Sequence, residues 1–240
     1  MSSKNYELKP LQWDTDYFGV SSARVNLYGI VSEKEQEEIV NFCKEYEFLT
    51  ICNIDNVIEN NHWISKKTDA FLVDVNLQYQ KRIESNFRFI SPDTYIANCL
   101  SKNNRISDIA INTFKHSRFF NDPFLPKYQT SNIYHHWTES AFNNKKKYFI
   151  IHEKAGLITG FILFSLSNSN SIIELIAVDE KYQGQGIGKK LINTLESYTA
   201  NMRLKHIDVG TQSSNTTAVL FYQKMGFMYV GCRSIYHLWI

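Results

Sequence analysis

One glycine-rich segment in the last third of the chain contains residue types that can hold a phosphate group. It reads Gln183-Gly184-Gln185-Gly186-Ile187-Gly188-Lys189 and lies between an apolar run and a stretch of helical spacing. Backbone N–H groups at the start of a helix converge on an anion, and glycines permit close approach because they carry no side chain. Lys189 can add a positive charge to the same site.

Two other phosphate-binding motifs do not fit this segment. A Walker loop requires Gly-Lys-Ser/Thr, whereas Gly188-Lys189 is followed by Lys190. A dinucleotide-binding fingerprint requires Gly-x-Gly-x-x-Gly at the opening of a βαβ unit and a later acidic residue for the ribose. A Gly-x-Gly on its own is as typical of a tight turn or a helix cap as of a phosphate site.

A second segment, residues 215–227, combines a helix-capping residue with a tyrosine. Asn215 opens a helix-like stretch that runs to Met225 and ends at Gly226. The hydroxyl of Tyr222 has an ordinary pKa of about 10, so it is protonated at neutral pH and can donate a proton. Considered alone, the segment is more simply explained by Asn215 as a helix cap and Tyr222 as a core residue.

The two segments, in this order, resemble the GNAT superfamily of N-acetyltransferases over roughly residues 93–240. Gln183, Gly186 and Gly188 match that family's Gln/Arg-x-x-Gly-x-Gly/Ala motif, and residues 215–227 match its Asn…Ala…Tyr-x-x-x-Gly-Phe segment. The resemblance implies that acetyl-CoA is the cosubstrate, that the loop binds its pyrophosphate and that the preceding strand pairs with its pantetheine arm. The cofactor-binding residues expected on this basis are Ile176, Ala177, Val178, Gln183, Gly184, Gln185, Gly186, Ile187, Gly188, Lys189 and Asn215.

Acetyl transfer to an amine requires a neutral amine, stabilisation of negative charge on the carbonyl oxygen and protonation of the leaving thiolate. The resemblance implies that Tyr222 is the catalytic acid, and the backbone N–H of Val178 is expected to stabilise the oxygen. Glu174 is expected to accept the amine proton through water, although it is equally well explained as a polar residue on an exposed strand. The histidines lack metal-ligand spacing, so no metal is expected.

Residues outside the glycine-rich half suggest an acceptor. Residues 11–20, which read LQWDTDYFGV, and Ser117-Arg118-Phe119 followed by Asp122-Pro123, resemble the dTDP-fucosamine acetyltransferases, GNAT enzymes with an additional N-terminal domain. This resemblance implies a dTDP-linked 4-amino-4,6-dideoxy sugar as substrate. Arg118 is the expected substrate-binding residue because a guanidinium suits a phosphate, although a surface ion pair explains it as well.

The apolar periodicity predicts mixed secondary structure. A helix beginning at the Ser32-x-x-Glu35 capping pattern precedes a strand at 71–77, and a glycine-rich turn leads directly from a strand into a helix. Helices are expected over 32–48, 106–119, 131–142, 187–202 and 215–225, with strands over 71–77, 148–152, 157–166, 171–178 and 204–211 and one or two more before Ile240.

Ser91-Pro92-Asp93 marks a change in the character of the sequence and predicts a domain boundary. Residues 1–92 are expected to form a smaller α/β domain, truncated GNAT-like or accessory, and residues 93–240 the GNAT acetyltransferase domain. The fold class is therefore α/β (α+β). The resemblance adds a mixed, mainly antiparallel central sheet that is flanked by helices.

The overall composition favours a small-molecule substrate. Lys and Arg number 26 against 24 Asp and Glu, for a net charge of +2, so no strong field would attract nucleic acid or a membrane. The four cysteines lack paired spacing, and no signal-like apolar segment opens the chain, so a cytoplasmic protein is expected. Whether the chain forms a homodimer is left open.

The sequence thus predicts an N-acetyltransferase acting on a nucleotide-activated amino-deoxy sugar for surface polysaccharide synthesis. Two alternatives remain open at this point: a protein or peptide N-acetyltransferase with the same cofactor site, and a non-catalytic acetyl-CoA-binding module. An open acidic channel would favour the peptide enzyme. The presence of Tyr222 is a weak argument against the non-catalytic module.

Overall fold

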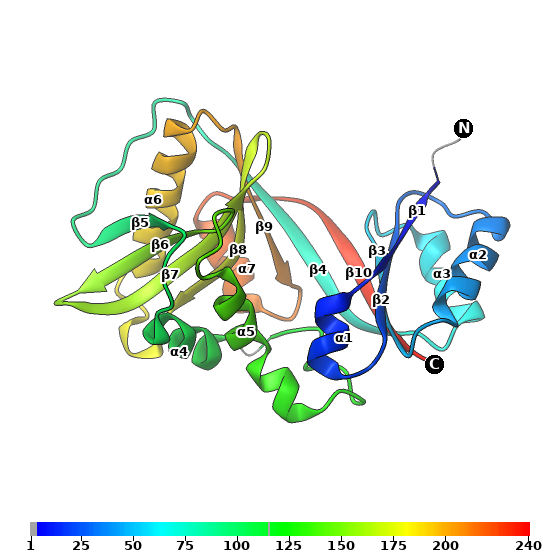
Figure 1. Cartoon of the computed structure of the whole chain (residues 1–240). Helices are drawn as coiled ribbons and strands as arrows, with labels where there is room; N and C mark the ends of the chain where they lie inside the picture. The colour runs from blue at the N-terminus through cyan, green and yellow to red at the C-terminus, as the bar shows by residue number, and fades with distance from the viewer. Residues whose placement is uncertain (1–3, 115) are drawn as a thin grey trace.

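The computed structural model describes residues 4–114 and 116–240, and its strands form one ten-stranded sheet in the order β1-β2-β3-β10-β4-β9-β8-β7-β6-β5 (Figure 1). Only the β2–β3 and β8–β9 pairs are parallel, so the predicted mixed and mainly antiparallel sheet is confirmed. The strands are β1 (Tyr6–Pro10), β2 (Ser22–Leu27), β3 (Phe48–Asn53), β4 (Phe71–Arg82), β5 (Thr94–Asn98), β6 (Tyr148–Lys154), β7 (Leu157–Leu166), β8 (Asn170–Val178), β9 (His206–Gln212) and β10 (Met228–Trp239).

Helices flank the sheet, and several begin or end where the sequence predicts. The capping box at Ser32 is present, because its side chain accepts from the Glu35 N–H while the Glu35 carboxylate accepts from the Ser32 N–H. The helices are α1 (Gln12–Phe18), α2 (Glu33–Cys43), α3 (Ile58–Lys67), α4 (Asn104–Thr113), α5 (Lys127–Ala141), α6 (Ile187–Asn201) and α7 (Thr216–Lys224), with a 3₁₀ turn at Glu180–Tyr182.

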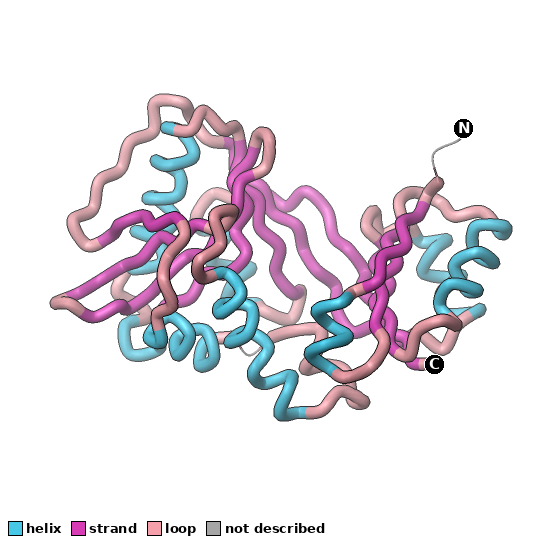
Figure 2. Tube along the Cα trace, in the orientation of Figure 1, coloured by secondary structure: helices cyan, strands magenta, loops and turns pink. Residues whose placement is uncertain are grey.

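Strand β4 joins the two halves of the chain. Although it precedes residue 92, it lies between β9 and β10 and pairs with both, so the sheet continues across the predicted domain boundary (Figure 2). β10, at the other end of the chain, pairs with β3 as well as β4. The division at residue 92 stays a prediction, and strands from either side of it alternate in the middle of the sheet.

Two apolar clusters cover opposite faces of the C-terminal part of the sheet. One packs α4 and α5 against residues such as Phe149, Phe161 and Leu175. The other packs α6 and α7 against the opposite face and includes Leu191 and Tyr222. The predicted antiparallel meander of three strands, now β6, β7 and β8, is confirmed.

The sequence pattern misses some elements and misplaces some ends. α5 begins at Lys127, four residues before the predicted start, because Pro126 provides the N-cap position. α4 ends at Thr113 rather than extending to 119. The short elements β1, α1, β2 and β5 are too brief to show a periodicity.

We expect a fragment of residues 93–240 to melt at least roughly 10 °C below the full chain, because β9 and β10 would lose the strand between them and expose two edges. Thermal unfolding followed by circular dichroism measures the difference. A fragment of residues 71–240 retains β4 and is the control that should recover part of the loss. Equal melting temperatures for the 93–240 fragment and the full chain would contradict the joining role of β4.

Candidate active site

The glycine-rich loop leads into α6, and no side chain caps the first turn of this helix. Gly186 is the N-cap residue with φ +77°, and Gly184 has φ +75°, a backbone region that favours glycine. A side-chain carbon at either position would meet no heavy atom within 4 Å. Because no side chain caps the helix and its first turn holds no acidic residue, the first N–H groups of α6 are available to an anion.

The charges around the loop also suit an anion. Lys189 is exposed, and no ion pair joins it to a residue in the described part of the chain. Lys154 Nζ donates to Gln185 Oε1 at 3.3 Å, and Gln183 Nε2 donates to the Val178 carbonyl at 3.0 Å. Gln183 therefore ties the loop back to β8, while Lys189 is left for a ligand.

Gly188 has a packing role in addition to its place in the motif. A side-chain carbon on this residue would lie 3.1 Å from the ring of Phe221, so glycine permits the close approach of α6 and α7. The sequence motif explained Gly188 by phosphate binding alone. Its position in the first turn of α6 is compatible with both roles.

The strand that leads into the loop separates from its parallel neighbour. β8 and β9 pair from Asn170–His206 to Ile173–Val209, and the ladder ends there. Beyond that point Ile176 and Val178 pack toward the α6 side, whereas Ala177 is buried on the α4–α5 side. The fork between the strands therefore leaves backbone groups of residues 174–178 on the β9 side for pairing with a ligand.

A register shift in β8 coincides with the start of the fork. Leu163 pairs with Leu175 and Phe164 with Ile173, which leaves Glu174 as the extra residue in β8. Its carboxylate accepts from Lys147 Nζ at 2.5 and 2.6 Å, and each side chain is 27% exposed. Glu174 is thus part of a solvent-accessible ion pair beside the fork, and its role as a base stays a prediction.

Tyr222 lies in the apolar cluster on the α6–α7 side of the sheet. It is 4% exposed, and its ring lies 5.5 Å from that of Phe227 and 6.1 Å from that of Tyr79. Burial raises the pKa of the Tyr222 hydroxyl above its usual value, so the group is held in its protonated form. The hydroxyl therefore carries its proton at any physiological pH.

Asn215 is the N-cap of α7. Its Oδ1 accepts from the Ala218 N–H at 3.1 Å, which is the capping arrangement that a helix start alone would explain. The amide nitrogen of Asn215 is not needed for this cap. Binding of pantetheine by Asn215 stays a prediction.

Arg118 is half-buried in the segment after α4. Its guanidinium carbon lies 4.1 Å from the ring centroid of Phe119, and its buried Nε has no hydrogen-bond partner. Burial raises the pKa of Asp74 to about 6, and the positive charge of Arg118 opposes that shift. The surface ion pair considered from the sequence is absent among the described residues, and substrate binding by Arg118 stays a prediction.

The described residues contain no group of three His, Cys, Asp or Glu side chains that could hold a metal ion. Within the same residues, no helix is both long and apolar enough to cross a membrane.

A family comparison decides what kind of domain this geometry belongs to. Residues 113–227 match the model of the Acetyltransferase (GNAT) family, and they include the fork, the glycine-rich loop and Tyr222. Over these residues the chain is similar to the GNAT family of acetyltransferases. The prediction of an acetyl-CoA-dependent N-acetyltransferase is thereby confirmed at the level of the family, whose members use acetyl-CoA as cosubstrate.

Two curated proteins are similar to this chain in sequence. The spore coat polysaccharide biosynthesis protein SpsD of Bacillus subtilis is 27% identical over 134 residues, which cover 56% of this chain and 46% of SpsD. The uncharacterized N-acetyltransferase MJ1530 of Methanocaldococcus jannaschii is 35% identical over 107 residues, 44% of this chain and 65% of that protein. The chain thus spans less than two thirds of the length of these curated relatives.

A solved structure is similar over nearly the whole fold. A functionally unknown conserved protein from Staphylococcus epidermidis aligns with a TM-score of 0.65 and 14% identity, covering 99% of this chain and 92% of the other. At this identity the likeness concerns the fold alone. It includes the N-terminal strands and helices that lie outside the GNAT family match.

Replacing Gly186 with Leu should weaken coenzyme A binding by about tenfold or more, because the new side chain would fill the open side of the loop. Isothermal titration calorimetry measures the affinity. Gly19→Leu is the matched control, since Gly19 has φ +74°, also has nothing within 4 Å and lies at the end of α1. Equal affinities in the two variants would remove the loop from the cofactor site.

Proposed function

We propose that this protein transfers the acetyl group of acetyl-CoA to the amino group of a nucleotide-activated amino-deoxy sugar, for surface polysaccharide synthesis. The sugar of the proposal is dTDP-linked. The observation that carries the choice of substrate is the similarity to SpsD, a protein named for polysaccharide biosynthesis. The resemblance of residues 11–20 and 117–123 to sugar-nucleotide acetyltransferases supports it.

Acetyl-CoA supplies an activated acetyl thioester, and the chain must place it and handle two protons. The first turn of α6 and Lys189 suit the diphosphate, and the free edge of β8 suits the amide groups of the pantetheine arm. In this proposal the Val178 N–H stabilises the negative charge that develops on the acyl oxygen. These contacts orient the thioester before the amine arrives.

Tyr222 is the proposed proton donor to the departing sulfur. Its burial keeps the hydroxyl protonated, and the surrounding rings of Phe221 and Phe227 restrict its orientation. The amine loses a proton in the same reaction. Glu174 is proposed to accept it through water, because its carboxylate is held beside the fork by Lys147 and remains in contact with solvent.

Tyr222→Phe should lower kcat by roughly 10²–10⁴-fold with little change in acetyl-CoA affinity, because the hydroxyl acts as the thiolate leaves. Since burial raises the Tyr222 pKa, wild-type kcat should not fall through loss of this proton until the pH exceeds about 10. Steady-state release of free thiol across the pH range measures both effects.

Tyr198→Phe is the control for this experiment, because Tyr198 is a partly buried tyrosine of the same aromatic cluster. Removing the Tyr198 hydroxyl should leave kcat nearly unchanged. A Tyr222→Phe enzyme that retained wild-type kcat would remove Tyr222 as the acid.

The acceptor class is tested by incubating the protein with acetyl-CoA and a panel of amines and following free thiol. We expect turnover of dTDP- or UDP-linked amino sugars and little turnover of peptides or spermidine. Turnover confined to peptides or polyamines would contradict the sugar assignment. Tight coenzyme A binding without turnover of any amine would support the non-catalytic alternative.

A further inference from the structure

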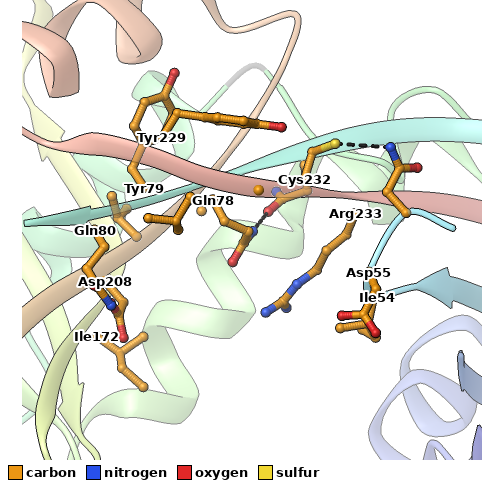
Figure 3. Close-up of a pocket in the computed structure, with 16 residues that line it drawn as sticks. Ile54, Asp55, Gln78, Tyr79, Gln80, Ile172, Asp208, Tyr229, Cys232 and Arg233 are labelled. Carbon is orange, nitrogen blue, oxygen red and sulfur yellow. Dashed lines mark hydrogen bonds between the residues drawn. The ribbon is translucent and has the colours of Figure 1, made fainter. Parts of the chain in front are cut away.

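An open cavity of about 920 Å³ lies on the face of the sheet where β4, β9 and β10 run side by side (Figure 3). This volume is within the range of small-molecule sites. The side chains of Gln78 and Arg233 project from one side of these strands, and those of Tyr79 and Tyr229 project from the other side. Gln78 and Arg233 therefore point away from the aromatic core in which Tyr79 packs against Tyr222.

Two glycines line the cavity on either side of Gln78. In the register of the sheet, Gln78 of β4 lies between Gly210 of β9 and Gly231 of β10. A side-chain carbon at Gly210 would lie 2.6 Å from Asn76 Oδ1 and 2.9 Å from Gln78 Nε2. The absence of a side chain on Gly210 is thus what leaves room for the amides of Gln78 and Asn76, whereas a side-chain carbon at Gly231 would meet nothing within 4 Å.

The lining is rich in amides whose hydrogen-bonding capacity is only partly used. Gln78 Nε2 donates to Asn76 Oδ1, and the Asn76 side chain also hydrogen-bonds the Asp74 carboxylate. A carboxamide has two donor hydrogens and an acceptor oxygen with two lone pairs, so both amides can still bind a ligand. Such groups suit hydroxyls, which both donate and accept.

The acidic groups of the cavity are already bonded within the protein. Asp208 accepts from Gln80 Nε2 at 2.8 Å and from Asn170 Nδ2 at 2.5 Å. Asp55 Oδ2 accepts from the Gly29 N–H at 2.9 Å. These bonds fix the positions of the two carboxylates and leave their negative charge in place.

Arg233 adds one positive charge at the far side of the cavity. It is exposed, lies directly opposite Asn76 on the paired strand and forms no ion pair with any residue in the ranges 4–114 and 116–240. Its side chain extends along the cavity in Figure 3. An exposed guanidinium that forms no ion pair can bind a phosphate through two parallel hydrogen bonds.

We propose that this cavity binds the acceptor as a sugar phosphate, with Asn76 and Gln78 contacting the sugar and Arg233 contacting the phosphate next to it. The inference rests on the proposed function and assigns its specificity to these three residues. Gly210 is the first residue of β9 after its last pair with β8, so the cavity adjoins the fork. Two strand spacings, about 10 Å, separate β9 from β10, which is room for one pyranose ring between the amine and the phosphate.

The test measures binding rather than turnover, with coenzyme A present and no acetyl donor. The ligands are dTDP-4-amino-4,6-dideoxygalactose and the same amino sugar without the nucleotide, each titrated by calorimetry. We expect Arg233→Gln to weaken binding of the nucleotide sugar at least tenfold and to leave binding of the free sugar unchanged. Arg233→Lys should recover part of the affinity for the nucleotide sugar. Gln78→Ala should lower the affinity for both ligands by a similar factor.

Arg88→Gln is the matched control, because Arg88 is exposed and lies outside the cavity. It should bind both ligands as the wild type does, and coenzyme A affinity should be the same in all variants. Unchanged nucleotide-sugar binding in Arg233→Gln would overturn this inference and leave the proposed function intact if that sugar is still acetylated. No nucleotide-sugar binding to the wild type would also overturn it, and acetylation of only peptides or polyamines would then show that the proposed function fails too.

Discussion

Backbone pairing between β8 and β9 stops at Ile173 and Val209, and the rest of the site depends on this interruption. Buried or half-buried N–H and C=O groups need partners, so a strand that leaves its neighbour must find another. The free edge that follows points into the fork, next to the first turn of α6 with its own free N–H groups. Two sets of main-chain groups are thus available side by side to one extended ligand.

β9 forms the second side of this fork, and β4 pairs with the opposite edge of β9. β4 closes the edge of β9 and carries Asp74, Asn76, Gln78 and Gln80 along one face, while β10 brings Arg233 to the same face. A polar cavity therefore exists only because strands from both ends of the chain meet there. On the opposite face, Tyr79 of the same strand packs with Tyr222. β4 thereby contributes both to the aromatic core around Tyr222 and to the cavity on the other face of the sheet.

The sequence was informative where a local constraint acts on a few adjacent residues. Gly184 and Gly186 lie in the turn into a helix that the motif predicts, and Asn215 and Tyr222 fall on the predicted helix. The cavity could not be predicted in this way, because Gln78, Gly210 and Arg233 are far apart in sequence and become neighbours only through the register of three strands. The contact of Gly188 with Phe221 likewise depends on tertiary packing, whereas the cap formed by Asn215 is a local contact that the sequence already suggested.

Amide hydrogen exchange with and without coenzyme A tests the central claim most directly, since it reports the main-chain groups themselves. The account predicts slower exchange for residues 174–178 and for Ile187, Gly188 and Lys189 when coenzyme A is added, and no comparable change in the N-terminal strands β1 and β2. Exchange rates in the fork and the first turn of α6 that are the same with and without coenzyme A would contradict it.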